Sequence, residues 1–252
     1  MTSDQKIEDL RAEHTAGAIA ARLAKATNHS YLRDFVYGGI DGAVTTFAVV
    51  SGVAGAGLSS GIVIVLGFAN LIGDGFSMAA SNYLGSKADL QLLAMARGTE
   101  EQHIEKYPEG EREEIRQILI AKGFSGEGLN EALRTITADK TLWVNTMLQE
   151  EYGLSLDRPS PVRAAVVTFL AFIAVGVLPL IAFLIDYAIP TNGASPFYWS
   201  TLLTGVAFLS VGAVKSRFVA GKWYWAGLET LVVGGTAAAL AFGVGMMLRG
   251  IA

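Results

Sequence analysis

The stretch FVYGGIDGAVTTFAVVSGVAGAGLSSGIVIVLGFANLIGDGFSMAASNY, residues 35–83, decides the fold of this chain. It contains two apolar runs, Phe35 to Ala54 and Ile62 to Tyr83, joined by the small-residue turn GAGLSSG at 55–61. Each run has about 20 residues, and a helix of that length, with a rise of about 1.5 Å per residue, crosses a hydrocarbon core roughly 30 Å thick. The stretch therefore predicts a hairpin of two transmembrane helices.

Polar side chains inside this hairpin indicate a path for a cation. Asp41 is the one charged residue of the first run, and the second run carries Asn70, Asp74 and Met78. These three recur at every fourth position, so they share one face of a helix. A carboxylate at the centre of a bilayer costs at least ~2.5 kcal/mol, so it is expected to face a polar interior or a pathway. Two acids, an amide and a thioether are suitable groups to line such a path.

The composition is that of a membrane protein with several spans. The chain has 252 residues, of which 52% are hydrophobic and 17% are charged, and 29 are glycines. This is too apolar for an ordinary soluble domain. The net charge of −4 does not favour nucleic acid as a partner. Because the sequence has no cysteine, disulfides, thiolate zinc sites and iron–sulfur clusters are excluded.

The segment from Lys87 to Asp157 is strongly acidic and holds 14 of the 23 acidic residues. Its pattern predicts three helices, at 87–106, 109–122 and 129–152, the first continuing the second span. Each is expected to end at a helix-breaking residue, namely Pro108, Gly123 and Gly153. The segment is too polar to face lipid and too periodic to be a linker, so it is expected to form a soluble domain between spans.

The rest of the chain returns to long apolar runs. They predict three further transmembrane helices, at 161–185, 197–214 and 223–248, with a kink at Pro179 in the first of them. A short external loop is expected at 186–195. Before the first span, residues 1–15 are polar and expected to fray, and residues 16–26 are either an interfacial helix or a solvated leader.

The distribution of Lys and Arg predicts the orientation. These residues precede the first span and follow the fourth, whereas the loops after the first and third spans have none; they are Arg22, Lys25, Arg33, Lys215, Arg217 and Lys222. The positive-inside rule then places the N-terminus and the acidic domain in the cytoplasm. With five spans, the C-terminus lies outside.

Several pairs in the acidic segment have the spacing of one helix face. They are Glu100 with His103, Glu111 with Glu114, and Met147 with Glu151. Packed together, they would surround a metal with carboxylates, an imidazole and a thioether, a set that suits Mn²⁺, Fe²⁺ or Zn²⁺ better than Mg²⁺ or Ca²⁺. The alternative is a solvated acidic face in which Arg112 and Arg116 pair with some of the acids. A di-iron oxidase is disfavoured, because such bundles use Glu-x-x-His twice and this chain has it once.

Three stretches resemble the vacuolar iron transporter family. They are RDFVYGGIDGAVTTFAVVSGVAGAGLSSGIVIVLGFANLIGDGFSMAASNYLGS at 33–86, PEGEREE at 108–114 and WVNTMLQEEYGL at 143–154. The resemblance covers nearly the whole chain and keeps the order of its parts. It implies a dimer with five spans per chain and a cytoplasmic three-helix metal-binding domain between spans two and three. It also implies export of Fe²⁺, and sometimes Mn²⁺, from the cytosol in exchange for protons.

The resemblance also implies particular metal ligands. The matching positions are Asp41 and Met78 in the membrane, and Glu100, Glu111, Glu114, Met147 and Glu151 in the acidic domain. At three positions the chain departs from the family pattern: His103 replaces a usual glutamate, Leu148 a frequent methionine, and Asn82 a glutamate found in many members. These departures bear on the number of ions bound and on the preferred metal. We keep His103 in the predicted ligand set, because an imidazole also binds these metals.

We therefore expect an all-α polytopic membrane protein with residues 1–33 as an N-terminal polar segment and interfacial helix, 34–86 as spans one and two, 87–158 as the cytoplasmic metal-binding domain and 159–252 as spans three to five. Its expected function is transport of Fe²⁺, and of Mn²⁺ as a second candidate, by proton antiport across a bacterial inner membrane. It is not expected to be an enzyme or to hold a prosthetic group. Asp41 and Asp74 are the candidates for proton coupling. The alternative is a membrane-anchored sensor or buffer of divalent metal, but such an anchor has no need of Asp41 within a span.

Overall fold

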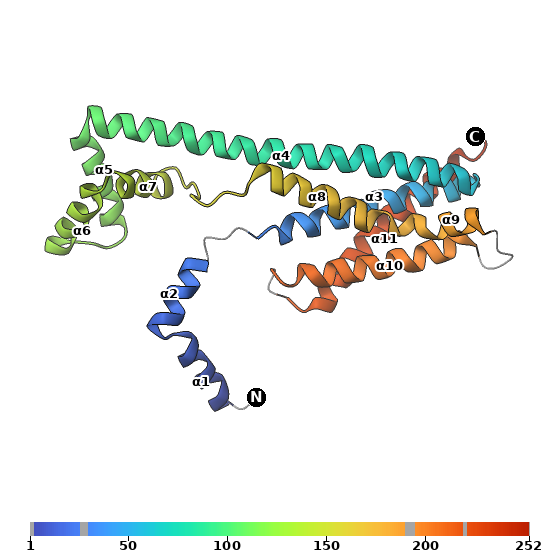
Figure 1. Cartoon of the computed structure of the whole chain (residues 1–252), viewed down its shortest axis with the longest axis horizontal. Coiled ribbons are helices and arrows are strands. Elements are labelled where there is room, and N and C mark those ends of the chain that lie inside the picture. The colour runs from blue at the N-terminus through green and yellow to red at the C-terminus, as the bar shows by residue number, and fades with distance from the viewer. Residues whose placement is uncertain (1–2, 26–29, 190–194, 219–220, 252) are drawn as a thin grey trace. The chain divides into compact units, whose positions relative to one another are not determined.

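The computed structural model describes residues 3–25, 30–189, 195–218 and 221–251. Over these ranges the regular elements are α-helices (Figure 1), as the sequence predicts. The chain divides into two compact units. The polar unit comprises Met1–His29 and Ser86–Pro159, and the apolar unit comprises Ser30–Gly85 and Ser160–Ala252. One long helix, α4 (Ser60–Lys106), contributes residues to both units.

The apolar unit contains the helices that are able to cross a membrane. Its elements are α3 (Leu32–Ala56), the first part of α4, α8 (Pro161–Gly176), α9 (Leu178–Ala188), α10 (Pro196–Lys215) and α11 (Trp223–Leu248). Within the described residues, α3, α4, α10 and α11 are each long and apolar enough to span. The pair α8 and α9 makes a fifth span if counted as one helix bent by 47°. The structure thus agrees with four to five spans.

The turns of this unit follow from local sequence. Gly57, with φ 75°, ends α3 in the left-handed conformation that glycine adopts without steric cost, and α4 begins at Ser60. The kink predicted at Pro179 is confirmed: the break falls at Val177, and Pro179 lies in the first turn of α9. The predicted loop at 186–195 begins later than expected, because α9 continues to Ala188, and residues 190–194 lie outside the described residues.

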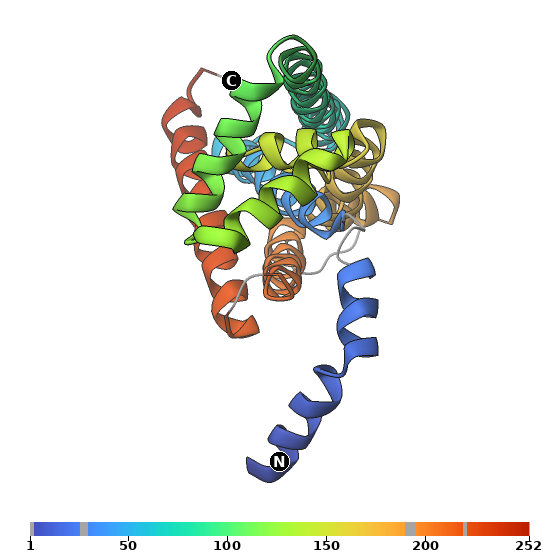
Figure 2. The same cartoon turned by 90° about the vertical axis from the view of Figure 1, so that its left-hand side faces the viewer.

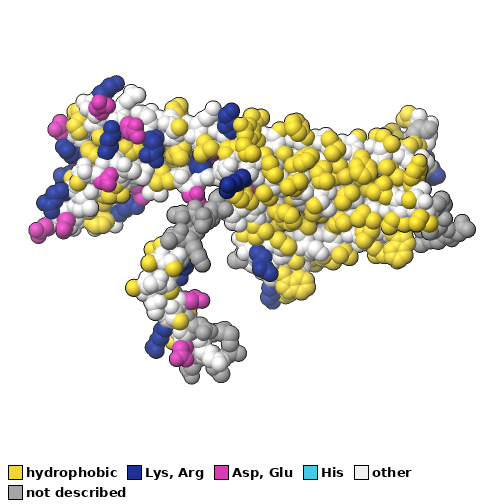
Figure 3. All heavy atoms as spheres, in the orientation of Figure 1, with side chains coloured by type: hydrophobic (Ala, Val, Ile, Leu, Met, Phe, Trp, Pro, Cys, Tyr) yellow, Lys and Arg dark blue, Asp and Glu magenta, His cyan; other side chains and the backbone are white. Residues whose placement is uncertain are grey.

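Helix α3 is the centre of the apolar unit and contacts α8, α10 and α11. Gly38 and Gly42 allow the close approach to α8, because a Cβ on either would collide with the backbone of Thr168 or Phe172. Helices α10 and α11 also contact each other, and Figure 2 shows them side by side in orange and red. Hydrophobic side chains cover most of the face of this unit that Figure 3 shows, and many large hydrophobic residues of the unit are exposed. Such a surface is expected where lipid is the solvent.

The polar unit contains α1 (Ser3–Glu13), α2 (Ala16–Lys25), the end of α4, α5 (Pro108–Ala121), α6 (Gly126–Ala138) and α7 (Lys140–Glu150). The expected fraying of residues 1–15 was wrong, since α1 occupies most of that segment. The helix expected at 16–26 is confirmed as α2 to Lys25, and Ala26 lies outside the described residues.

The single helix expected at 129–152 was also wrong. The chain breaks at Asp139, which has extended φ and ψ of −114° and 113° and whose carboxylate accepts hydrogen bonds from the N–H groups of Thr141 and Leu142. An aspartate that caps a helix in this way competes with continuation of the preceding helix. The polar unit therefore has α5, α6 and α7 packed with the end of α4, around a core formed by Ile104, Ile115, Leu119, Leu129, Trp143, Val144, Met147 and Leu148.

Candidate metal site

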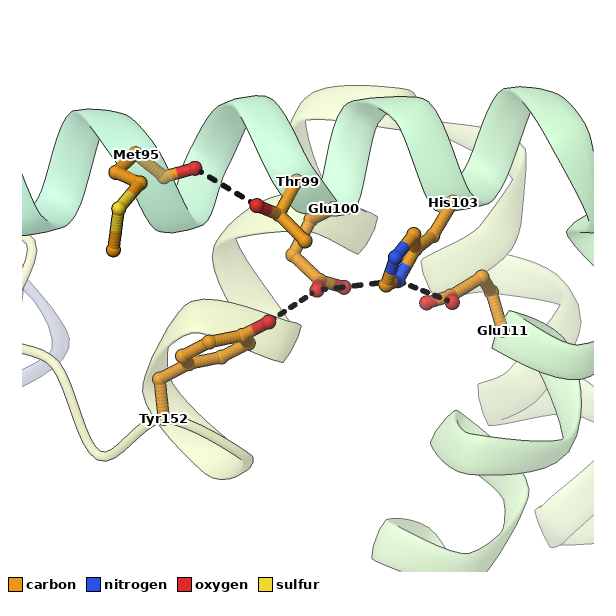
Figure 4. A network of polar contacts seen from close by, with 6 residues as sticks. All are labelled: Met95, Thr99, Glu100, His103, Glu111 and Tyr152. Atoms are coloured by element: carbon orange, nitrogen blue, oxygen red, sulfur yellow. Dashed lines mark hydrogen bonds and ion pairs between the residues drawn. The ribbon is translucent and has the colours of Figure 1, made fainter.

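Three side chains of the polar unit converge where α4 passes into α5. Glu100 and His103 lie near the end of α4, and Glu111 lies in the first turn of α5 (Figure 4). The His103 Nδ1 atom is 3.3 Å from Glu111 Oε1 and 3.9 Å from Glu100 Oε1. One ligand atom from each residue lies within 4.8 Å of the other two. The structure thus brings together three of the ligands that the sequence predicts.

The break between α4 and α5 produces this convergence. Tyr107, with φ −144° and ψ 63°, interrupts the helical path after Lys106. Its N–H donates to the His103 carbonyl at 2.7 Å, which closes the last turn of α4. Pro108 then opens α5, where its fixed φ suits a first helical position and its missing N–H costs nothing. The predicted helix end before Pro108 is confirmed.

Both carboxylates of this cluster are buried. Glu100 is 1% exposed and Glu111 is 5% exposed, and the Oε2 atom of each has no hydrogen-bond partner among the described residues. The His103 side chain is 55% exposed and leaves the cluster open on one side. An unsatisfied buried acceptor costs about 1–3 kcal/mol, and more when it is charged. A divalent cation bound between these oxygens and the imidazole would remove that cost, so the residues present fit such an ion.

The electrostatics of the cluster agree with this interpretation. Burial, the charges of Glu100 and Glu114 and a hydrogen bond with Glu100 raise the pKa of Glu111 to about 7. Burial and the same two charges also raise the pKa of Glu151. Each of these carboxyl groups therefore holds its proton more tightly than it does in water, and a cation would compete with that proton.

The remaining predicted ligands of the polar unit lie beside this cluster, on α5 and at the end of α7. Glu114, Met147 and Glu151 line a hollow of about 620 Å³, together with Glu113 and other residues. Met147 is fully buried, whereas Glu114 and Glu151 are exposed. The solvated acidic face proposed as an alternative therefore describes these two glutamates but not Glu100 or Glu111.

The nearby arginines make other contacts. The Arg116 Nε atom lies 3.3 Å from Glu113 Oε2, so Arg116 pairs with an exposed acid. The guanidinium carbon of Arg112 lies 5.7 Å from the centre of the Trp143 ring, which is a cation–π contact. In these contacts neither arginine neutralises Glu100 or Glu111.

The predicted membrane ligands lie in the apolar unit. Asp41 on α3 and Asp74 on α4 are half-buried and close enough for their charges to interact. Met78, one turn further along α4, is partly buried against the apolar core. The Asn70 amide donates to the hydroxyls of Thr45 at 3.2 Å and Thr46 at 3.4 Å, so it ties α4 to α3.

Two polar contacts have no signal in the sequence pattern. The hydroxyl of Tyr152, just beyond α7, donates to Glu100 Oε1 at 2.9 Å (Figure 4). The Asn82 amide donates to Asp34 Oδ1 at 2.9 Å and to the Thr168 hydroxyl at 2.8 Å, and so joins α3, α4 and α8. The sequence marks Asn82 only as a departure from the family pattern, and it gives no signal for Asp34 or Thr168 as its partners. Partners this distant in sequence are set by tertiary packing.

Comparison with known proteins gives the family. A model of the VIT family matches residues 32–246, which is most of the chain. The chain belongs to the VIT family. A vacuolar iron transporter of Toxoplasma gondii is 31% identical, over 88% of this chain and 76% of the relative. Vacuolar iron transporter 1 of Eucalyptus grandis is 30% identical over 88% of each chain, and vacuolar iron transporter 1 of Arabidopsis thaliana is 29% identical over 84% of this chain and 83% of the relative.

Membership of the VIT family confirms two of the sequence-based expectations. The resemblance seen in the quoted stretches is correct, and these relatives are named as transporters rather than as enzymes. The apolar helices agree with an integral membrane protein. The matched range includes Asp41 and Met78 in the apolar unit and the Glu100, His103 and Glu111 cluster in the polar unit.

Proposed function

We propose that this protein transports Fe²⁺ out of the cytosol, with Mn²⁺ as a second cargo, and that protons move in the opposite direction. The observation that carries the proposal is the buried pair Glu100 and Glu111 beside the imidazole of His103, in which one oxygen of each glutamate has no hydrogen-bond partner among the residues that the structure describes. The family relatives named as iron transporters support iron as the cargo. Carboxylate and imidazole ligands together suit Fe²⁺.

In this proposal the polar unit is the cytoplasmic metal-binding domain and collects the ion. Its acidic side chains attract cations and raise their local concentration. The Glu100, His103 and Glu111 cluster binds the ion, and Glu114, Met147 and Glu151 in the neighbouring hollow supply further ligands. The electrostatic interaction of Glu151 with Glu100 supports the proximity of the residues in the hollow to the cluster.

The ion then enters the apolar unit, where Asp41 and Met78 are the proposed ligands. Asp41 alternates between metal and proton, which couples the two fluxes. The charge of Asp74 acts on Asp41, so Asp74 is the second candidate for proton coupling. Met78 contributes a soft ligand that favours Fe²⁺ over Mg²⁺ and Ca²⁺. We further propose that the working form is a homodimer in a bacterial inner membrane, with the N-terminus and polar unit in the cytoplasm and the C-terminus outside.

The test is metal flux into proteoliposomes with and without a pH gradient. Native protein is expected to move Fe²⁺ (under anaerobic conditions) and Mn²⁺ into the liposomes faster when the lumen is more acidic than the outside, because protons then leave as metal enters. Asp41→Ala is expected to reduce this flux to background, because it removes the group shared by metal and proton, while metal still binds to the polar unit. Glu229→Gln is the matched control: this exposed acid pairs with Lys215 at 2.8 Å, so its loss is expected to leave flux unchanged.

Two results would contradict the proposal. Gradient-driven flux near the native rate in Asp41→Ala would remove Asp41 from the pathway. Tight metal binding by native protein with no flux under any gradient would favour the alternative, a membrane-anchored sensor or buffer.

A further inference from the structure

The Tyr152 hydroxyl contacts only one of the two carboxylate oxygens of Glu100. The Tyr152 hydroxyl donates to Glu100 Oε1 at 2.9 Å, while Glu100 Oε2 is buried and has no hydrogen-bond partner among the described residues. The two oxygens of one carboxylate are therefore in different states. Oε1 accepts the phenol proton and lies 3.9 Å from His103 Nδ1, whereas Oε2 accepts no hydrogen bond from the described residues.

The end of α7 places Tyr152 at this point. Glu151 and Tyr152 donate their backbone N–H groups to the Met147 carbonyl at 2.9 and 3.4 Å, and Leu154 donates to the Leu148 carbonyl at 2.9 Å. Gly153, with φ 63°, makes the left-handed turn that this capping pattern requires. Met147 and Leu148 are fully buried, so the turn that carries Tyr152 is anchored in the core of the polar unit.

We infer that Tyr152 is a specificity-determining positioning residue, which holds Glu100 as a one-oxygen ligand and thereby selects transition-metal ions against Ca²⁺. The inference rests on the proposed role of Glu100 as a metal ligand. Ca²⁺ takes about 6–8 oxygen ligands and often binds both oxygens of a glutamate. Tetrahedral and octahedral transition-metal sites need fewer oxygens and accept an imidazole such as that of His103. A donor fixed on Oε1 opposes the two-oxygen mode and leaves the one-oxygen mode intact.

The same contact orients the carboxylate. Residues that hydrogen-bond to a metal ligand typically change metal affinity by roughly 10–100-fold when they are removed. Tyr152 and Glu100 are 52 positions apart in the sequence, so their hydrogen bond connects the end of α7 to α4 at the site. Selection and orientation thus come from one hydroxyl group.

The test measures two affinities on each preparation of the full chain in detergent micelles. Mn²⁺ binding is followed by electron paramagnetic resonance, and Ca²⁺ binding by its competition with Mn²⁺. Tyr152→Phe keeps the ring and removes only the hydroxyl, and it is expected to lower the ratio of the Ca²⁺ dissociation constant to the Mn²⁺ dissociation constant by roughly tenfold. Because both constants come from the same preparation, loss of folded protein cancels in the ratio.

Two further variants make the result specific. Tyr187→Phe removes a hydroxyl from an exposed tyrosine of α9, in the other unit, and is expected to keep the native ratio. In a Glu100→Gln background, Tyr152→Phe is expected to cause no further change, since its effect acts through the Glu100 carboxylate. An additional fall in the ratio there would overturn the inference.

The outcomes separate this inference from the proposed function. If Glu100→Gln weakens Mn²⁺ binding but Tyr152→Phe keeps the native ratio, Tyr152 has no role in selection and the metal site stands. Equal weakening of both ions by Tyr152→Phe would also overturn the inference, because it would show a structural role alone. If Glu100→Gln leaves Mn²⁺ binding unchanged, the proposed metal site itself fails.

Discussion

At the scale of single residues, Glu100 and Glu111 carry an energetic cost that a soluble protein normally avoids. Both side chains are buried, and one oxygen of each lacks a hydrogen-bond partner among the described residues. Two carboxylates at such short range also repel each other when both are charged. The pair therefore supports the proposal of a bound cation, because a cation would compensate this cost.

Glu111 gives a prediction about pH. Because its pKa is raised to about 7 and a metal binds the charged form, protons compete with the metal below that pH. Mn²⁺ affinity of the full chain is expected to fall roughly tenfold per pH unit below about 7, and to level off above it. Glu111→Gln is expected to bind more weakly at pH 8 and to show a shallower dependence. Titration calorimetry between pH 6 and 8 measures both effects.

The control for this prediction is Glu127→Gln, which changes an exposed acid in the first turn of α6. It is expected to reproduce the native pH profile. A profile of the same slope in Glu111→Gln would show that the proton released on binding comes from another group.

At the scale of elements, α4 is long enough to serve both units. Its 47 residues correspond to a helix of about 70 Å, more than twice a hydrocarbon core of roughly 30 Å. About half of the helix therefore lies beyond a single membrane crossing, and Glu100 and His103 lie close to its polar end. This extension is the reason a single helix contributes both Met78 and the first two residues of the polar cluster.

The contact between α3 and α8 gives a prediction about stability. Gly42→Ala is expected to destabilise the apolar unit by about 1–3 kcal/mol, because the added Cβ collides with the backbone of Phe172 and the two helices must separate. Thermal unfolding in detergent, followed by circular dichroism, measures the loss. The close approach of small residues in membrane helices depends on such positions.

Gly73→Ala is the matched control for Gly42→Ala. Gly73 lies in α4, where an added Cβ meets no atom within 4 Å. Alanine favours a helix by up to ~1 kcal/mol relative to glycine, so this variant is expected to be neutral or slightly more stable. Equal destabilisation by both variants would contradict the packing explanation.

At the scale of the whole molecule, charge divides the chain into two parts. Charged side chains gather on the polar unit and hydrophobic ones on the apolar unit (Figure 3). The basic residues Lys215 and Lys222 flank the turn between α10 and α11. With the positive-inside rule, these features favour a cytoplasmic polar unit.

Single cysteines test this orientation, and the native chain has none to interfere. Ser59→Cys, in the exposed turn between α3 and α4, is expected to react with an impermeant thiol reagent added to intact cells. Glu127→Cys, in α6 of the polar unit, is expected to react only after the membrane is permeabilised. The reverse pattern of labelling would overturn the orientation.

Features that depend on local composition could be predicted from the sequence. The bounds 223–248 match α11, and the bend near Pro179 and the break before Pro108 were predicted correctly. The turn predicted at 55–61 is present but shorter, because α3 continues to Ala56 and α4 begins at Ser60. Transmembrane helices and their ends can be predicted from sequence, because the length of an apolar run and the positions of glycine and proline act on the backbone locally. The quoted stretches were also sufficient for the family resemblance.

The tertiary structure alone decided which of the acidic residues are buried and what they face. Their spacing made Glu100, Glu111, Glu114 and Glu151 equal candidates for metal ligands. Packing, however, buries Glu100 and Glu111 and leaves Glu114 and Glu151 exposed. The break at Asp139 arises because a side-chain cap prevailed over the helical pattern, and the Tyr152 contact joins residues 52 positions apart. Burial and distant hydrogen bonds depend on how helices pack against each other, which no local pattern encodes.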